Sequence, residues 1–108
     1  MRHLIAAVVL AGSVAPAWSD GYVMGSGRWT CAQAIQAWEG KPIDKGQLAG
    51  WIMGYWSAAT FERETKFVDT VEKVGGLKIV EATLSECRKA PGETLLYKVT
   101  RSMIVNTK

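Results

Sequence analysis

Few side chains in this sequence of 108 residues have the types and spacing that catalysis needs. The only histidine is His3, and the chain contains neither a G-x-S-x-G elbow nor a glycine-rich phosphate loop. Two pairs of carboxylates, Glu62 with Glu64 and Glu81 with Glu86, are of the type that glycoside hydrolysis uses. Neither pair lies beside a recognisable apolar cleft, and charges at these spacings are typical of a solvated face. The sequence therefore predicts no catalytic residue, no metal site, no cofactor and a protein that is not an enzyme.

The first 19 residues resemble a secretory signal peptide. A basic start is followed by an apolar stretch, and small residues then offer cleavage near Ala17 or Ser19. The alternative, an uncleaved membrane anchor, needs about 20 apolar residues, and this stretch is shorter. We therefore expect export, cleavage, a periplasmic location and no membrane insertion of the mature protein. Cleavage also removes His3, and with it the commonest general base and metal ligand.

Cys31 and Cys87 are the only cysteines in the sequence. In an oxidising exported compartment, two cysteines of a small domain most often form one disulfide. A two-cysteine metal site would need further ligands that histidines do not supply here, and the spacing is not that of a C-x-x-C redox motif. The sequence thus predicts a Cys31–Cys87 bridge, which should stabilise the fold by about 4 kcal/mol on the chain-entropy model.

Apolar periodicity predicts four helices, and hence a small all-α domain over 29–108, a four-helix orthogonal bundle with one disulfide. Thr30 and Gln33 have the spacing of a capping box, which would begin the first helix and point Cys31 inward. The alternating charges after the second helix favour a solvated loop with a short ordered piece. The expected elements are a flexible arm over 20–28, helices that begin near 30, 44, 77 and 93, and the loop over 62–73.

The second helix is predicted to be central, because its apolar arc covers more than half of its circumference. The small residues Gly50, Gly54 and Ser57 occupy most of the remaining face and would let another backbone approach closely. In the alternative, a second subunit or a bound polypeptide covers part of the arc, in particular Met53 and Trp56, because a chain this short has little material to cover it. The arc comprises Leu48, Trp51, Ile52, Tyr55 and Ala59 in one stripe and Ala49, Met53 and Trp56 in a second.

Strong acid would change the net charge of a protein with this composition, and with it the compactness of the chain. Cleavage after Ser19 leaves 12 basic and 10 acidic side chains, so protonation of every carboxylate would raise the formal side-chain charge from +2 to +12. Repulsion would then expand the chain, while the disulfide would prevent a free coil. The tryptophan-rich second helix would be partly uncovered. Because the charges alternate instead of forming a basic patch, nucleic-acid binding is not expected.

Several short motifs, spread from about Trp29 to Met103, carry a resemblance to a known family. They are Trp29-Thr30-Cys31 at the start of a helix, an apolar helix with Trp51, Gly54, Tyr55 and Trp56, then Asp69-Thr70-Val71, and a helix ending in Cys87 with Pro91 and Leu95 behind it. In these motifs the sequence resembles the HdeA/HdeB family. The resemblance implies a small all-helical periplasmic protein with a single disulfide, dimeric near neutrality. It also implies an ATP-independent chaperone that strong acid activates and that prevents aggregation of unfolded client proteins.

The resemblance also implies roles for particular residues. Cys31 and Cys87 would form the bridge, and most of the second helix's aromatic residues would lie in the segment linked with dimerisation and client contact. The expected client or dimer surface therefore comprises Trp51, Ile52, Met53, Tyr55 and Trp56.

A second function fits the same class of small exported helical domains with one or two disulfides. A periplasmic immunity or inhibitor protein would present a rigid surface to one partner. It would be folded and active at neutral pH, whereas the chaperone would be inert there and promiscuous in acid.

Overall fold

The computed structural model describes residues 21–108, so the predicted signal peptide over 1–19 and the first residue of the predicted arm lie outside the described residues. The described part is all-helical, as predicted, but it contains five α-helices where the sequence predicts four. None of these helices is long and apolar enough to cross a membrane. The elements are the 3-10 helix η2 (Gly25–Arg28) and the α-helices α2 (Cys31–Trp38), α3 (Pro42–Thr60), α4 (Thr65–Val74), α5 (Gly76–Lys89) and α6 (Leu96–Asn106).

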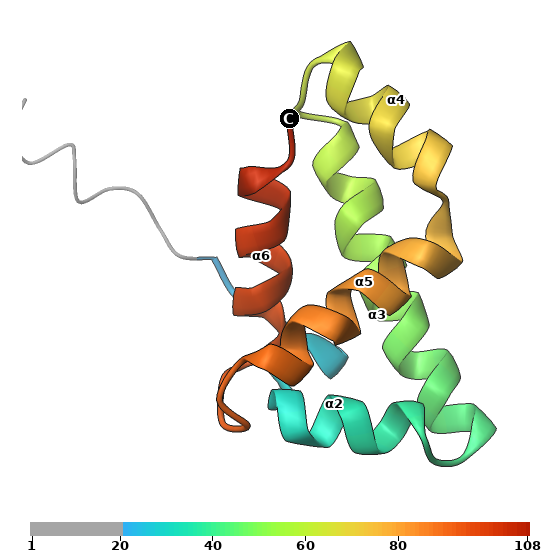
Figure 1. The fold of residues 1–108 in the computed structure, drawn as a ribbon, viewed down its shortest axis with the longest axis vertical. Coiled ribbons are helices and arrows are strands. Elements are labelled where there is room, and N and C mark those ends of the chain that lie inside the picture. Colours follow the sequence, from blue (N-terminus) through green and yellow to red (C-terminus); the bar gives the residue numbers. More distant parts are fainter. Residues whose placement is uncertain (1–20) are drawn as a thin grey trace, which may run out of the picture.

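The helices pack around one core, with α5 crossing α3 and contacting α2 and α6 as well (Figure 1). In this view α2 runs along the base, and α4 lies beside the C-terminal half of α3. The core draws buried apolar side chains from all five α-helices. They are Cys31, Ala34, Leu48, Ile52, Trp56, Phe67, Ile79, Val80, Leu84, Cys87, Leu96 and Ile104.

The predicted disulfide is present and joins the first residue of α2 to the last turn of α5. Both cysteines are fully buried. The loop after α5 crosses the start of α2, where the backbone N–H of Cys31 donates to the carbonyl of Thr94 at 2.7 Å and that of Ala32 donates to Gly92 at 3.0 Å. These bonds satisfy two donors that the first turn of a helix leaves unpaired. The predicted capping box also forms: Gln33 N–H donates to Thr30 Oγ1.

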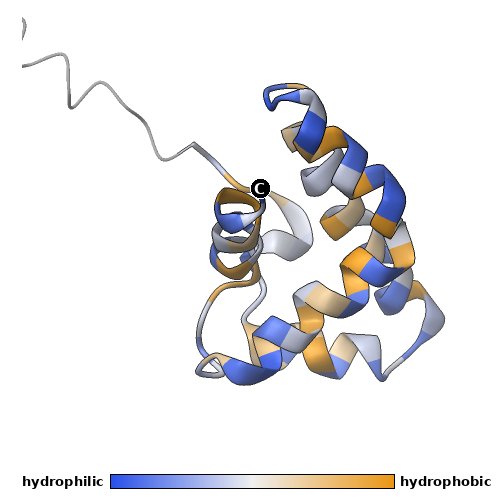
Figure 2. Cartoon of the chain, turned by 45° about the horizontal axis from the view of Figure 1, so that its top comes forward, coloured by the Kyte–Doolittle hydropathy of each residue, from blue (hydrophilic) through white to orange (hydrophobic). Residues whose placement is uncertain are grey.

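Helix α4 corrects the prediction of a mainly solvated loop over 62–73. Phe67 is its one buried residue, and the half-buried Val71 lies one helical turn further on. The ring of Phe67 stacks on that of Trp56 with 6.2 Å between centroids. The N-cap residue Glu64 makes no side-chain cap, so packing of this one apolar stripe is what holds the helix. Figure 2 shows hydrophilic and hydrophobic residues interspersed along α4. The charged residues obscure the short apolar stripe in the sequence.

Three further boundaries differ from the sequence prediction. Part of the predicted flexible arm, Gly25–Arg28, is the 3-10 helix η2, with Ser26 and Gly27 buried. Helix α3 begins at Pro42, two residues early, because proline suits the first helical position, where no N–H is needed. Helix α6 begins at Leu96 and not near Glu93, because Thr94 is used in the pairing with α2.

Replacing both Cys31 and Cys87 by Ser should cost about 4 kcal/mol of folding free energy, because the bridge closes a sequence separation of 56 residues. Thermal unfolding at neutral pH, followed by circular dichroism, should show a strongly lowered Tm or no cooperative transition. An unchanged melting curve would contradict the assignment of the bridge as the main constraint on the fold.

Candidate functional site

Two of the five residues expected on the client or dimer surface are part of the core. Ile52 is fully buried and Trp56 is only 5% exposed. The indole Nε1 of Trp56 donates to Oγ1 of Thr83, which is itself buried and donates to the carbonyl of Ile79. Helix α3 is therefore the core helix that its apolar arc predicts, and these two side chains can meet a partner only if the helices above them separate.

Trp51 and Tyr55 stack on each other on a second side of α3, with ring centroids 4.9 Å apart. The chain before α2 covers Trp51: its Nε1 donates to the carbonyl of Met24 at 2.9 Å, and Gly27 lies directly against the indole. A Cβ at Gly27 would overlap the ring atoms of Trp51, so the close approach requires glycine there. The segment that the sequence predicts to be a loose arm thus covers one member of the stacked aromatic pair.

Met53 lies on a third side and is 40% exposed. Its Sδ fills the space that a Cβ at Gly76 would occupy, at the junction between α4 and α5. Gly75 makes this junction possible, because its φ of +86° ends α4 and lets α5 begin at the next residue. The five expected residues consequently face three different surroundings and do not form one exposed patch.

The remaining side of α3, here called the outer face, was not recognised as a site in the sequence. No described atom outside the helix's own backbone lies within 4 Å of the Cβ positions of Gly46, Gly50 and Gly54. The expected close approach of another part of this chain to these small residues therefore does not occur. The outer face is uncharged along its whole length and comprises Ile43, Gly46, Gln47, Gly50, Gly54, Ser57, Ala58 and Phe61.

Large apolar side chains stand at both ends of the outer face. Ile43 is 69% exposed and Phe61 is 88% exposed. A solvent-facing helix side of this length normally carries charged residues. The spacing of the small residues by four was the sequence signal, but its solvent exposure depends on which side of α3 the other helices cover.

Arg63 connects the turn after α3 to the end of α6. Its two terminal nitrogens donate to the carbonyls of Ile104 and Thr107, each at 2.9 Å, and its guanidinium carbon lies 4.1 Å from the ring centroid of Phe67. These carbonyls belong to the C-terminal end of α6, which attracts a cation. Beside this contact, α4, α5 and α6 enclose an apolar hollow of about 170 Å³, lined in part by Trp56, Val71, Val74, Ile79 and Met103.

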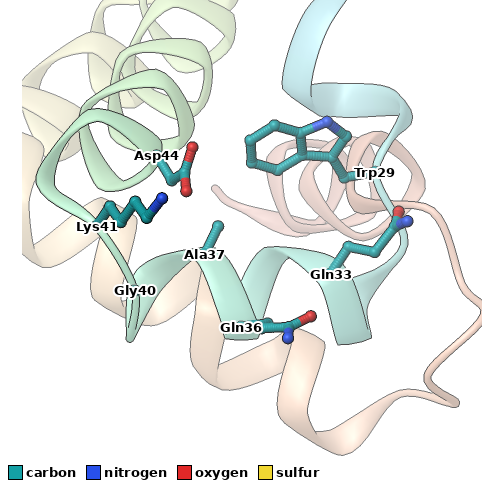
Figure 3. Close-up of a pocket in the computed structure, with 7 residues that line it drawn as sticks. All are labelled: Trp29, Gln33, Gln36, Ala37, Gly40, Lys41 and Asp44. Atoms are coloured by element: carbon teal, nitrogen blue, oxygen red, sulfur yellow. The ribbon is translucent and has the colours of Figure 1, made fainter.

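An open hollow of about 420 Å³ with a mixed polar and apolar lining lies at the elbow between α2 and α3. Figure 3 shows Trp29 on one side, Lys41 and Asp44 together on the other, and Ala37 between them. Gln33, Gln36 and Gly40 complete the lining. No sequence pattern marks this group, because Trp29 and Asp44 come together only through the bend at the elbow.

Within residues 21–108, no three or more His, Cys, Asp or Glu side chains gather closely enough to hold a metal ion. Of the four carboxylates considered for catalysis, Glu62, Glu64 and Glu81 are exposed. Glu86 pairs with Lys89 at 3.1 Å. Searches of family models, curated proteins and solved structures found no match for this chain.

Gly27→Ala should destabilise the protein by about 1–3 kcal/mol, because the added methyl must displace η2 or the Trp51 indole. The matched control is Gly46→Ala, where the space is open and alanine is the better helix former, so stability should rise by up to about 1 kcal/mol. Urea unfolding at neutral pH measures both changes. Equal stability of the two variants would show that Gly27 does not rest on Trp51 in solution.

Proposed function

We propose that this protein is a periplasmic, ATP-independent chaperone that strong acid activates, an HdeA/HdeB-like orthogonal helical bundle that binds unfolding proteins through apolar surface buried near neutrality. The observation that carries this proposal is the stacked pair of Trp56 and Phe67, which lies beneath α4. Separation of α4 from the bundle exposes this pair and widens the adjoining apolar hollow. A client side chain can then bind where Phe67 packed.

Helix α4 has the charge pattern that an acid response needs. Four of the ten acidic residues of the expected mature chain fall within 62–74, together with three basic residues. Protonation of these carboxylates changes the formal charge of the segment from −1 to +3. The rest of the chain becomes cationic at the same time, so repulsion favours the separation of α4 from the bundle.

The opposite end of the molecule resists the same repulsion. The buried disulfide ties α2 to α5, and the pairing of Cys31 with Thr94 places the loop before α6 against both. Neither constraint includes α4. An acid state in which α4 is released while α2 and α5 remain joined offers apolar surface without complete unfolding.

Arg63→Gln tests this release, because it removes the guanidinium contacts to Phe67 and to the end of α6. Hydrogen bonds from a charged donor contribute about 1.5–3 kcal/mol, so the variant should suppress client aggregation at a higher pH than the unaltered protein. Light scattering from an acid-denaturing client, recorded across a pH series down to about pH 2 to 3, measures this onset.

Arg101→Gln is the matched control, since it removes the same charge from an exposed position on α6. It should leave the onset pH close to that of the unaltered protein. Identical profiles for the two variants would refute the release of α4. Failure of the unaltered oxidised protein to reduce scattering at any pH would refute the chaperone function itself.

The proposal includes a homodimer near neutral pH, and the outer face of α3 supports it. Two copies of this helix can lie antiparallel about a two-fold axis midway between Gly50 and Gly54. Residues of similar polarity then face each other: Gly50 faces Gly54 of the second copy, and Gln47 faces Ser57. The large ends also match, because Ile43 faces Phe61. Such self-complementarity is what a two-fold interface requires. The glycines allow the helix axes to approach to about 8 Å.

Gly50→Leu should abolish this association without harming the fold, because leucine fills the open groove and is also a better helix former by about 1 kcal/mol. Sedimentation equilibrium at neutral pH should show a dimer for the unaltered protein and a monomer for the variant. Ser85→Leu, at an exposed position on α5, is the control and should remain dimeric. A Gly50→Leu variant that dimerises as before would exclude the outer face as the interface.

The second candidate function, an immunity or inhibitor protein, draws on the same exposed side chains. Phe61 is 88% exposed, and one tight partner could cover it in place of a second copy. A monomeric unaltered protein that also fails to protect clients in acid would favour this alternative.

A further inference from the structure

We propose that the hollow at the α2–α3 elbow is a binding site for a neutral saccharide, a function separate from client protection. The site lies between Trp29, α2 and the first turn of α3, and its lining includes neither Trp56 nor Phe67. Its volume of about 420 Å³ is within the range of small-molecule sites. Its lining combines one indole ring with two side-chain amides, one ammonium and one carboxylate (Figure 3).

The walls of this hollow are fixed before any ligand arrives. The backbone of Trp29 bonds on both sides, with its N–H donating to Ser26 and its carbonyl accepting from Leu96. The next residues form the capping box and the disulfide. Across the elbow, the ammonium of Lys45 lies 4.9 Å from the ring centroid of Trp38 and ties α3 to α2. These contacts hold the backbone of the site in place.

The polar groups of the hollow have hydrogen-bonding capacity to spare. Gln33 uses its Oε1 to accept from the backbone of Thr30, and this bond leaves its amide N–H groups available. Among the described residues, the side chains of Trp29, Gln36, Lys41 and Asp44 form no hydrogen bond and no ion pair. Donors and acceptors from three chain segments therefore surround one space.

The chemistry of the lining selects the ligand class. The formal charges of Lys41 and Asp44 cancel, so neither an anion such as phosphate nor a simple cation gains a net attraction. A side-chain amide can donate and accept hydrogen bonds, and a carboxylate can accept them. Both can therefore bind the adjacent hydroxyls of a sugar ring, which donate and accept hydrogen bonds. The Trp29 indole ring supplies apolar contact for the C–H side of such a ring. A pyranose unit therefore matches both the polar side chains and the aromatic ring of the hollow.

The experiment is a titration of the ¹⁵N-labelled oxidised protein with glucose, N-acetylglucosamine and maltose up to about 100 mM at neutral pH. We expect saturable shifts of the Trp29 indole N–H and the Gln36 amide signals with at least one sugar. Gln36→Ala should weaken that binding severalfold by removing an exposed hydrogen-bonding side chain. Ser85→Ala removes an exposed neutral polar side chain of α5 outside the hollow and should bind as the unaltered protein does.

Three outcomes would overturn the proposal. The first is the absence of saturable shifts with every sugar. The second is equal loss of binding in the Gln36→Ala and Ser85→Ala variants, which would place the site elsewhere. The third is binding of glycine, added as a zwitterionic probe, without binding of any sugar, which would assign Lys41 and Asp44 to an amino-acid ligand. None of these results depends on acid or on a client protein, so the chaperone proposal is tested separately.

Discussion

The buried Cys31–Cys87 bridge is the constraint on which the arrangement of the other elements depends. It joins the short helix α2, only eight residues long, to the last turn of α5, and a helix of that length is not stable alone in water. The same region receives the loop before α6, through the carbonyl of Thr94. Helices α3 and α4 lie within the covalently closed loop. Only α3 crosses the joined pair closely, so α4 depends on weaker attachments.

Those attachments give the molecule two ends of unequal stability. At the base, a covalent bond, a capping box and backbone pairs hold α2, α5 and the start of α6. At the other end, α4 is held by one buried ring, Phe67, by the half-buried Val71 and by the Arg63 guanidinium. Proteins open locally where such attachments are fewest. Our functional proposal rests on this difference, because a chaperone must expose apolar surface and still recover its fold.

Sequence patterns were informative where apolar spacing and special residues agreed. The Thr30 and Gln33 capping box and the wide apolar arc of α3 located two helices correctly, and export chemistry predicted the disulfide. The pattern was misleading over 62–74, because Phe67, Val71 and Val74 also have helical spacing but are outnumbered by charges. That segment is a helix because Trp56 offers Phe67 a partner 11 residues away in the chain. No local signal reports such a partner.

The sequence by itself determined that this is an all-helical domain with one bridge, since periodicity and cysteine count are local or compositional properties. It did not determine which side of α3 meets solvent. Ile52 and Trp56 are in the core, Trp51 is covered by η2 and the residue before it, and the glycine side is open, because the other helices and η2 cover only part of the helix. The elbow hollow has the same origin: Trp29 and Asp44 are neighbours only after α2 and α3 bend. Tertiary packing decides these matters, since a side chain's exposure depends on elements distant in the chain.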